Sequence, residues 1–146
     1  MSKLIFVNLP VENLDRSIAF YEAIGARKNP QFSDDTGACM VLSDVIHVMI
    51  LTHDKFKRFA IRPIPDVRAT GNEVLLCLSA DSKTEVDTLV TAAASAGGRA
   101  DVNAPDDHDF MYGRSFEDPD GHVWETMWMD MAGFQAAQGQ VGSSTS

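Results

Sequence analysis

The hydrophobic positions of this chain form short runs with the two-residue period of β-strands, and two of these runs precede a segment with helical spacing. The first run, residues 4–9, predicts a strand that carries Asn8 among apolar residues. A helix should follow, because Asn13 suits its N-cap position and Gly25 suits the residue after its end. Turn-forming residues then separate three further predicted strands, at residues 26–33, 37–42 and 46–52.

The same pattern restarts after an irregular connector. Two prolines interrupt residues 55–69, where only a short helical turn is expected. A strand at residues 74–78 is followed by a helix that Asp81 or Ser82 can cap and that ends before Gly97. The remaining predicted strands are residues 99–103, 110–116 and 122–129.

The two halves therefore repeat one strand, one helix and three strands. Their helix-ending glycines lie about 70 residues apart, a longer period than that of ordinary solenoids, and two copies are too few for a solenoid. The simplest account is an α+β fold of two βαβββ modules, in which a helix packs on one face of each four-stranded half-sheet. The other two faces would curve together around a cleft.

These patterns divide a single expected domain into four parts. The first module covers about residues 1–54, the connector 55–72, the second module about 73–130 and a flexible tail 131–146. The tail is rich in Gly, Gln and Ser, and its last part, residues 142–146, is expected to be disordered.

Composition narrows the choice of partners and compartment. The 146 residues carry a formal net charge of -9, and an acidic surface disfavours nucleic acid and anionic membranes. No apolar run approaches the roughly 18 residues that span a bilayer, and the N-terminus does not resemble a signal peptide. Cys39 and Cys77 form no spaced pair, so we expect reduced thiols in a cytoplasmic protein.

Residues 116–125, FEDPDGHVWE, combine a tight turn with a strand that carries a carboxylate. Asp118, Pro119 and Gly121 fit a type I turn, in which Gly121 is free to adopt a positive φ. Both faces of the following strand are largely apolar, so Glu125 is expected to point into an enclosed space. A carboxylate there needs a partner, a proton or a metal. The alternative is a plain hairpin turn with a surface or ion-paired glutamate.

Three segments carry a family resemblance. They are FVNLPVENLDRSIAFYEAIGA, LLCLSADSKTEVDTLVTAAASAGG and YGRSFEDPDGHVWE. They resemble, in that order, the first strand and helix, the second strand and helix, and the last hairpin of the vicinal-oxygen-chelate superfamily. That superfamily includes glyoxalase I, fosfomycin- and bleomycin-resistance proteins and extradiol dioxygenases. The resemblance covers about residues 3–130, and the paired βαβββ order agrees with it.

The resemblance implies an incomplete barrel of two modules around a cleft, commonly completed by a second copy in a homodimer. It also implies the place of a metal, on the inward face of the first and last strand of each module, which here falls on Asn8, Ile50, Cys77 and Glu125. Metal-dependent relatives carry His, Gln or Glu at these places. Only Glu125 matches, since an amide ligates weakly, Ile50 has no donor atom, and a thiolate at Cys77 would favour softer metals.

From this set of donor atoms we expect no cofactor. The alternative is a divalent metal bound through Glu125. Without a metal, Asn8, Ile50 and Cys77 would line a ligand pocket. Glu125 would then be a general base, a hydrogen-bond acceptor for the ligand, or a structural residue bonded to Asn8.

Two residues of the penultimate strand are further ligand-binding candidates. Tyr112 and Arg114 share a strand face, so Tyr112 would line the pocket and Arg114 would hold an anion. The alternative is packing by Tyr112 and a surface ion pair by Arg114. By strand alternation His122 faces away from Glu125, and it is not a candidate.

Three functions are compatible with these features. The first is an enzyme, a lyase, isomerase or dioxygenase that acts on a small oxygen-rich substrate with Glu125 as base or ligand. The second is a metal-free protein that binds a small, antibiotic-like molecule without chemistry, as the bleomycin-resistance branch does. The third is a dimeric structural or regulatory module with a vestigial site.

Overall fold

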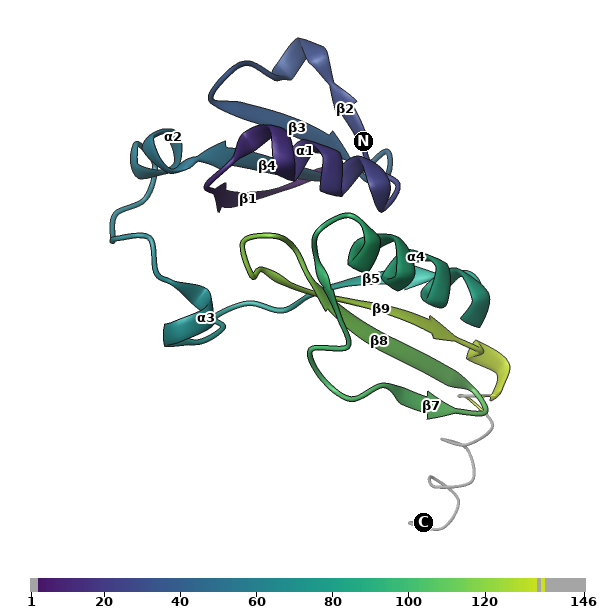
Figure 1. The fold of residues 1–146 in the computed structure, drawn as a ribbon. Coiled ribbons are helices and arrows are strands. Elements are labelled where there is room, and N and C mark those ends of the chain that lie inside the picture. Colours follow the sequence, from purple (N-terminus) through teal and green to yellow (C-terminus); the bar gives the residue numbers. More distant parts are fainter. Residues whose placement is uncertain (1–2, 134, 136–146) are drawn as a thin grey trace.

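The computed structural model describes residues 3–133 and 135, and it contains two mixed β-sheets (Figure 1). Module 1 consists of β1 (Ile5–Val11), α1 (Leu14–Ala23), β2 (Arg27–Asn29), the 3-10 turn η1 (Pro30–Phe32), β3 (Gly37–Val41) and β4 (Ile46–Thr52). Its strand order is β1-β4-β3-β2. β1 and β4 run parallel, and the other pairs are antiparallel.

Module 2 repeats this arrangement after a connector with two short helices, α2 (His53–Lys57) and α3 (Val67–Thr70). Its elements are β5 (Leu76–Ala80), α4 (Lys83–Ser95), β6 (Arg99–Ala100), β7 (Asp106–His108), β8 (Met111–Glu117) and β9 (Val123–Met129). The order is β5-β9-β8-β6, with β7 paired to β8. The predicted α+β fold of two βαβββ modules is confirmed, and the described strands form an open arrangement rather than a closed barrel.

Local sequence signals explain where the helices begin and end. The Asn13 side chain accepts a hydrogen bond from the backbone N–H of Arg16 at 3.0 Å and caps α1. Of the two predicted caps for α4, Ser82 is the one used, because its Oγ accepts from the backbone N–H of Glu85 at 3.0 Å. Gly25 follows α1 with a φ of 106°, which costs a glycine little.

Two strands are shorter than predicted for local reasons, and one strand was not predicted. β2 ends at Asn29, because Pro30 has no N–H for a strand ladder and begins η1 instead. β6 ends at Ala100, next to Asp101 with a φ of 53°. The segment predicted as a loop before the penultimate strand contains the short strand β7. The predicted disorder of residues 142–146 lies outside the described residues.

The two modules share one hydrophobic core. Phe20 and Tyr21 of α1 are fully buried, and their rings lie 6.2 Å from Phe116 and 6.1 Å from Trp124, both in module 2. The helix-facing sides of both sheets are thus turned toward the other module. In Figure 1, α4 accordingly covers the side of its sheet that faces module 1.

A buried polar contact fastens the turn before β9 to α1. The Tyr21 hydroxyl donates to Asp118 Oδ2 at 2.7 Å and accepts from Trp124 Nε1 at 3.1 Å. Burial raises the pKa of the Asp118 carboxyl. Gly121 completes the turn with a φ of 92°, as its sequence predicted. The FEDPDGHVWE segment therefore joins the two modules as well as turning the chain.

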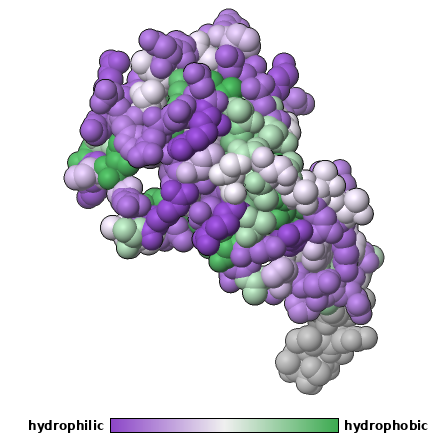
Figure 2. Space-filling model, in the orientation of Figure 1, coloured by the Kyte–Doolittle hydropathy of each residue, from purple (hydrophilic) through white to green (hydrophobic). Residues whose placement is uncertain are grey.

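The described part of the chain contains no helix long and apolar enough to cross a membrane. Figure 2 shows a largely hydrophilic face with scattered apolar residues and an opening beside the connector. This opening lies where the chain between α2 and α3 arches away from both modules (Figure 1).

Candidate functional site

Glu125 lies on the side of module 2 that is turned away from the shared core. Its neighbours along β9, Trp124 and Thr126, are buried on the helix-facing side. Strand alternation therefore places Glu125 on the opposite face. The register pairs it with Cys77 of β5 on one side and Ser115 of β8 on the other. Glu125 is half-buried in the middle of this face.

Two cavities meet at Glu125. One has a volume of about 670 Å³ and the other about 130 Å³. Both are lined by Asn103, Ser115 and Glu125. Ser115 Oγ accepts a hydrogen bond from the backbone N–H of Asn103 at 2.9 Å, which holds the preceding loop over the face. Among the described residues none donates a hydrogen bond to the Glu125 carboxylate, so this acceptor is open to a ligand.

Cys77 beside Glu125 is held as a thiol. Partial burial raises its pKa, and the negative charge of Glu125 raises it further. Neither Cys77 nor the buried Cys39 is in a disulfide. A protonated sulfur is a poor nucleophile and a poor metal ligand.

Module 1 places different residues at the equivalent point. The register pairs Asn8 with Met49, as it pairs Cys77 with Glu125. The prediction that Ile50 faces the cleft is wrong, because Ile50 is fully buried in the core and packs on the helix-facing side. The predicted alternation of faces along β4 was shifted by one residue, so Met49 rather than Ile50 lies on the open face. The Asn8 amide donates to the Phe6 carbonyl of its own strand at 3.3 Å.

These residues do not fit the metal site that the resemblance implied. The four equivalent positions carry an amide, a thioether, a protonated thiol and one carboxylate, which are one strong ligand and three weak ones. No group of three or more His, Cys, Asp or Glu residues within the described chain is placed to hold a metal ion.

Tyr112 and Arg114 lie on the helix-facing side of β8, away from the Glu125 carboxylate. The Tyr112 hydroxyl donates to Asp87 Oδ1 of α4 at 2.6 Å. The Arg114 guanidinium binds Asp87 Oδ1 at 2.9 Å and Asp101 Oδ2 at 2.7 Å. Arg114 borders the smaller cavity, but its charge is taken up by these two carboxylates. These contacts agree with the alternative prediction for Arg114, which was an ion pair rather than a bound anion.

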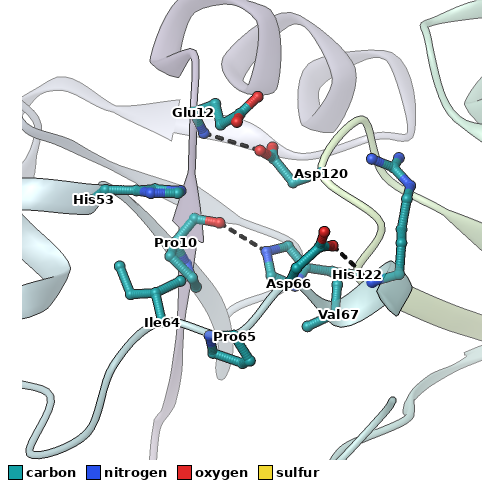
Figure 3. A pocket seen from close by; sticks show the side chains of 10 residues that line it. Pro10, Glu12, His53, Ile64, Pro65, Asp66, Val67, Asp120 and His122 are labelled. Atoms are coloured by element: carbon teal, nitrogen blue, oxygen red, sulfur yellow. Dashed lines mark hydrogen bonds between the residues drawn. The ribbon is translucent and has the colours of Figure 1, made fainter. Parts of the chain in front are cut away.

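A second group of polar side chains lies between the modules, beneath the connector (Figure 3). His122 Nε2 donates to the Pro10 carbonyl at 2.8 Å, and Asp120 Oδ1 accepts from the backbone N–H of Glu12 at 2.9 Å. His53 points into the same cavity from the other side (Figure 3). Sequence reasoning missed this cavity, because its residues come from three segments whose proximity only the fold shows.

Ser115 and Asn103 were also missed. Ser115 could have been found, because Glu125 and the hairpin turn fix which residue of the preceding strand lies opposite it. Asn103 precedes a loop, and no periodic pattern marks its side chain.

Residues 3–126 match the family model described as the Glyoxalase/Bleomycin resistance protein/Dioxygenase superfamily. The chain belongs to this superfamily, as the sequence resemblance indicated. A search of curated proteins found no match.

Solved structures show the same fold. Hypothetical protein SA1046 from S. aureus is 26% identical, with a TM-score of 0.72 over 88% of this chain and 94% of that one. A glyoxalase/bleomycin resistance protein/dioxygenase family enzyme from Burkholderia phytofirmans is 20% identical, with a TM-score of 0.70 over 88% and 99%. The fosfomycin resistance protein FosX from Mesorhizobium loti is 16% identical, with a TM-score of 0.63 over 88% and 92%.

Proposed function

We propose that this protein acts on a small oxygen-rich molecule that binds on the open face of module 2, with Glu125 as general base. The observation that carries the proposal is the Glu125 carboxylate, which has no hydrogen-bond donor among the described residues and lies where cavities of about 670 and 130 Å³ meet. A volume of this size suits a small-molecule ligand. A general base needs an unoccupied acceptor within reach of the substrate proton.

The chemistry proposed needs only the chain's own side chains. Asn103 borders both cavities and would orient polar atoms of the ligand, while the Ser115 hydroxyl holds the Asn103 backbone in place. The protonated Cys77 carries no charge. An oxygen-rich molecule with an acidic C–H next to a carbonyl fits such a base. Because Glu125 supplies the only strong ligand at the inherited place, a metal is not part of the proposal.

The second candidate is binding without chemistry, as in a resistance protein that sequesters its ligand. The observation that favours it is the weak donor set, since Asn8, Met49 and Cys77 supply neither a strong metal ligand nor a second proton-transfer group. This candidate uses the same cavities, with Glu125 as a hydrogen-bond acceptor.

We propose further that a second copy of the chain covers this face. β1 and β5 are edge strands, and large apolar side chains beside them are about half exposed: Leu4, Ile5, Phe6, Val74 and Leu75. Exposed apolar edge strands favour pairing with another chain. A homodimer would place the Asn8 and Met49 face of one copy near the Glu125 face of the other.

Proton exchange separates the two candidates. Hydroxyacetone in D₂O, followed by ¹H NMR, should lose its α-proton signal faster with the protein, and Glu125→Gln should abolish this acceleration. Glu22→Gln, at an exposed position of α1, is the matched control and should behave as the wild type. Ligand line broadening without exchange, lost in Glu125→Gln, would favour the binding protein instead. An unchanged effect in Glu125→Gln would exclude both.

Metal analysis and sedimentation test the two remaining parts of the proposal, the absence of a metal and the homodimer. Stoichiometric metal in protein purified without chelator, lost on Glu125→Gln, would contradict the metal-free proposal. Sedimentation should show a dimer that Phe6→Lys dissociates, because a charge on the edge strand blocks pairing. A wild-type monomer at micromolar concentration would exclude the dimer.

A further inference from the structure

Two cavities lie side by side between the modules, beneath the connector. One has a volume of about 350 Å³ and the other about 520 Å³. The two cavities adjoin, and both are lined by Pro10, Pro65, Val67 and His122. Each volume is in the range that small-molecule pockets occupy. Neither cavity is lined by Glu125, although together they share Val67, Arg68, Asn72 and Val123 with the 670 Å³ cavity that Glu125 lines.

The smaller cavity is polar and carries an excess of negative charge. The carboxylates that line it are Glu12, Asp66 and Asp120, whereas Arg68 is the one Lys or Arg side chain among its described lining residues. Arg68 is already bound, since its Nη2 donates to the Pro119 carbonyl at 3.0 Å and its Nε lies 3.5 Å from Glu117 Oε1. Asp120 is also occupied, by Arg16 and Ser17. Two of the three carboxylates, Glu12 and Asp66, therefore have no cation bound among the described residues.

Several groups that remain open in this cavity can accept a hydrogen bond. Asp66 Oδ1 accepts the backbone N–H of Arg68 at 3.1 Å, and its other oxygen has no donor among the described residues. The His53 ring makes no hydrogen bond to the described residues, and it points into the cavity opposite Asp66 and His122 (Figure 3). His122 Nε2 donates to Pro10, so in the neutral ring Nδ1 is the acceptor.

The larger cavity is lined mostly by apolar side chains. Leu9, Phe56, Val74, Leu76 and Val123 form its walls, and they come from β1, the connector, β5 and β9. A compartment of this kind favours an aliphatic or aromatic group over water. It opens beside the polar cavity, so one molecule can reach both.

We propose that these two cavities form a binding site for a small amphipathic amine. The ammonium group binds between Asp66 and His53, where it donates to the open acceptors and offsets the excess negative charge of the lining. The apolar body fills the compartment beneath the connector. The site does not include Glu125, and its ligand bridges β1, the connector and β9.

The charge requirement is tested by NMR titration of the full chain with three probes of matched shape. The probe 2-phenylethylamine, an ammonium ion at neutral pH, should shift backbone amide signals of residues 53–56, 66–74 and 122. The anion 3-phenylpropanoate should produce no saturable shift, and neutral 2-phenylethanol should bind more weakly than the amine. Equal shifts for the amine and the anion, or no shift with any probe, would overturn the proposal.

Two substitutions divide the site into its polar and apolar parts. Asp66→Asn retains the cap of α3, because Asn caps as well as Asp, but it should weaken the amine about fivefold, the effect of losing one partly exposed ion pair. Phe56→Ala should weaken the amine and the alcohol alike. Glu125→Gln is the control and should bind all probes as the wild type does. An unchanged amine affinity in Asp66→Asn would overturn the assignment.

Discussion

The two modules carry the same elements in the same order, but the strand pairs at their centres differ in polarity. Where β3 and β4 pair Ala38 with Ile50, β8 and β9 pair Arg114 with Thr126. On the open faces, Met49 of module 1 corresponds to Glu125 of module 2. At these positions module 1 carries apolar side chains, whereas module 2 carries the ionisable Arg114 and Glu125. One backbone plan tolerates both, because alternation separates the face that packs from the face that binds.

The largest difference in stability between equivalent substitutions in the two modules is expected in the shared core. Trp124 is 2% exposed and packs against Tyr21 of module 1. Trp124→Ala should lower the free energy of unfolding by about 4 kcal/mol, because it leaves a large cavity. Val48→Ala, at the corresponding position of module 1, should cost roughly 2 kcal/mol, in proportion to the smaller side chain removed. Urea denaturation measures both, and equal losses would contradict a core that depends on module 2 aromatics.

The second-largest loss of stability is expected where the Tyr21 hydroxyl links the two modules. Tyr21→Phe removes the donor to Asp118 and the acceptor for Trp124 Nε1, and both partners are buried. We expect a loss of about 2 kcal/mol in urea denaturation, the cost of buried polar groups left unpaired. Tyr112→Phe is the matched control. It breaks an exposed bond to Asp87 and should change stability by only a few tenths of that amount. A similar loss in both variants would show that burial does not set the cost.

Thr126 offers a test in which module 2 becomes more like module 1. Its Oγ1 is buried and has no hydrogen-bond partner among the described residues. Thr126→Val keeps the shape, removes the unpaired hydroxyl and should stabilise the protein by about 1 kcal/mol in thermal denaturation. Thr36→Val is the contrasting variant, because the Thr36 hydroxyl donates to Asp34. It should destabilise the protein, and a stabilising effect there would point to hydrophobicity alone.

The smallest effect is expected at Arg114 and depends on pH. Hydrogen bonds from Arg114 lower the pKa of Asp101, and those from Tyr112 and Arg114 lower that of Asp87. A folded-state pKa below the unfolded value of about 4 stabilises the fold above that pH, and this contribution is lost as the pH falls through the folded pKa. Because solvent screens these carboxylates, Arg114→Gln should cost under about 1 kcal/mol at neutral pH.

Thermal denaturation at a series of pH values checks this. The difference between wild type and Arg114→Gln should shrink on acidification below about pH 4, as the carboxylates become protonated. Arg27→Gln, at an exposed strand residue with no ion pair among the described contacts, is the control and should show no such trend. A difference independent of pH would mean that Arg114 acts through packing.

Local patterns were sufficient for the elements and for the superfamily. The caps at Asn13 and Ser82 and the turn at Gly121 lie where residue type and spacing predict them, because capping and positive φ depend on neighbouring residues alone. Alternation correctly separated Glu125 from Trp124. It failed for Ile50, since the run from Val48 to Leu51 within β4 is apolar on both faces and gives no sign of which face is buried.

The sequence by itself determined the order of strands and helices, the repeated module and a carboxylate on the open face of β9. Only the tertiary structure decided that Met49 rather than Ile50 faces outward, that Arg114 is held by Asp87 and Asp101, and that His53 and His122 line one cavity between the modules. The physical reason is the distance along the chain over which each interaction acts. Periodicity and capping act over a few residues, whereas these contacts join segments far apart in the chain, and their partners are selected by how the two modules pack.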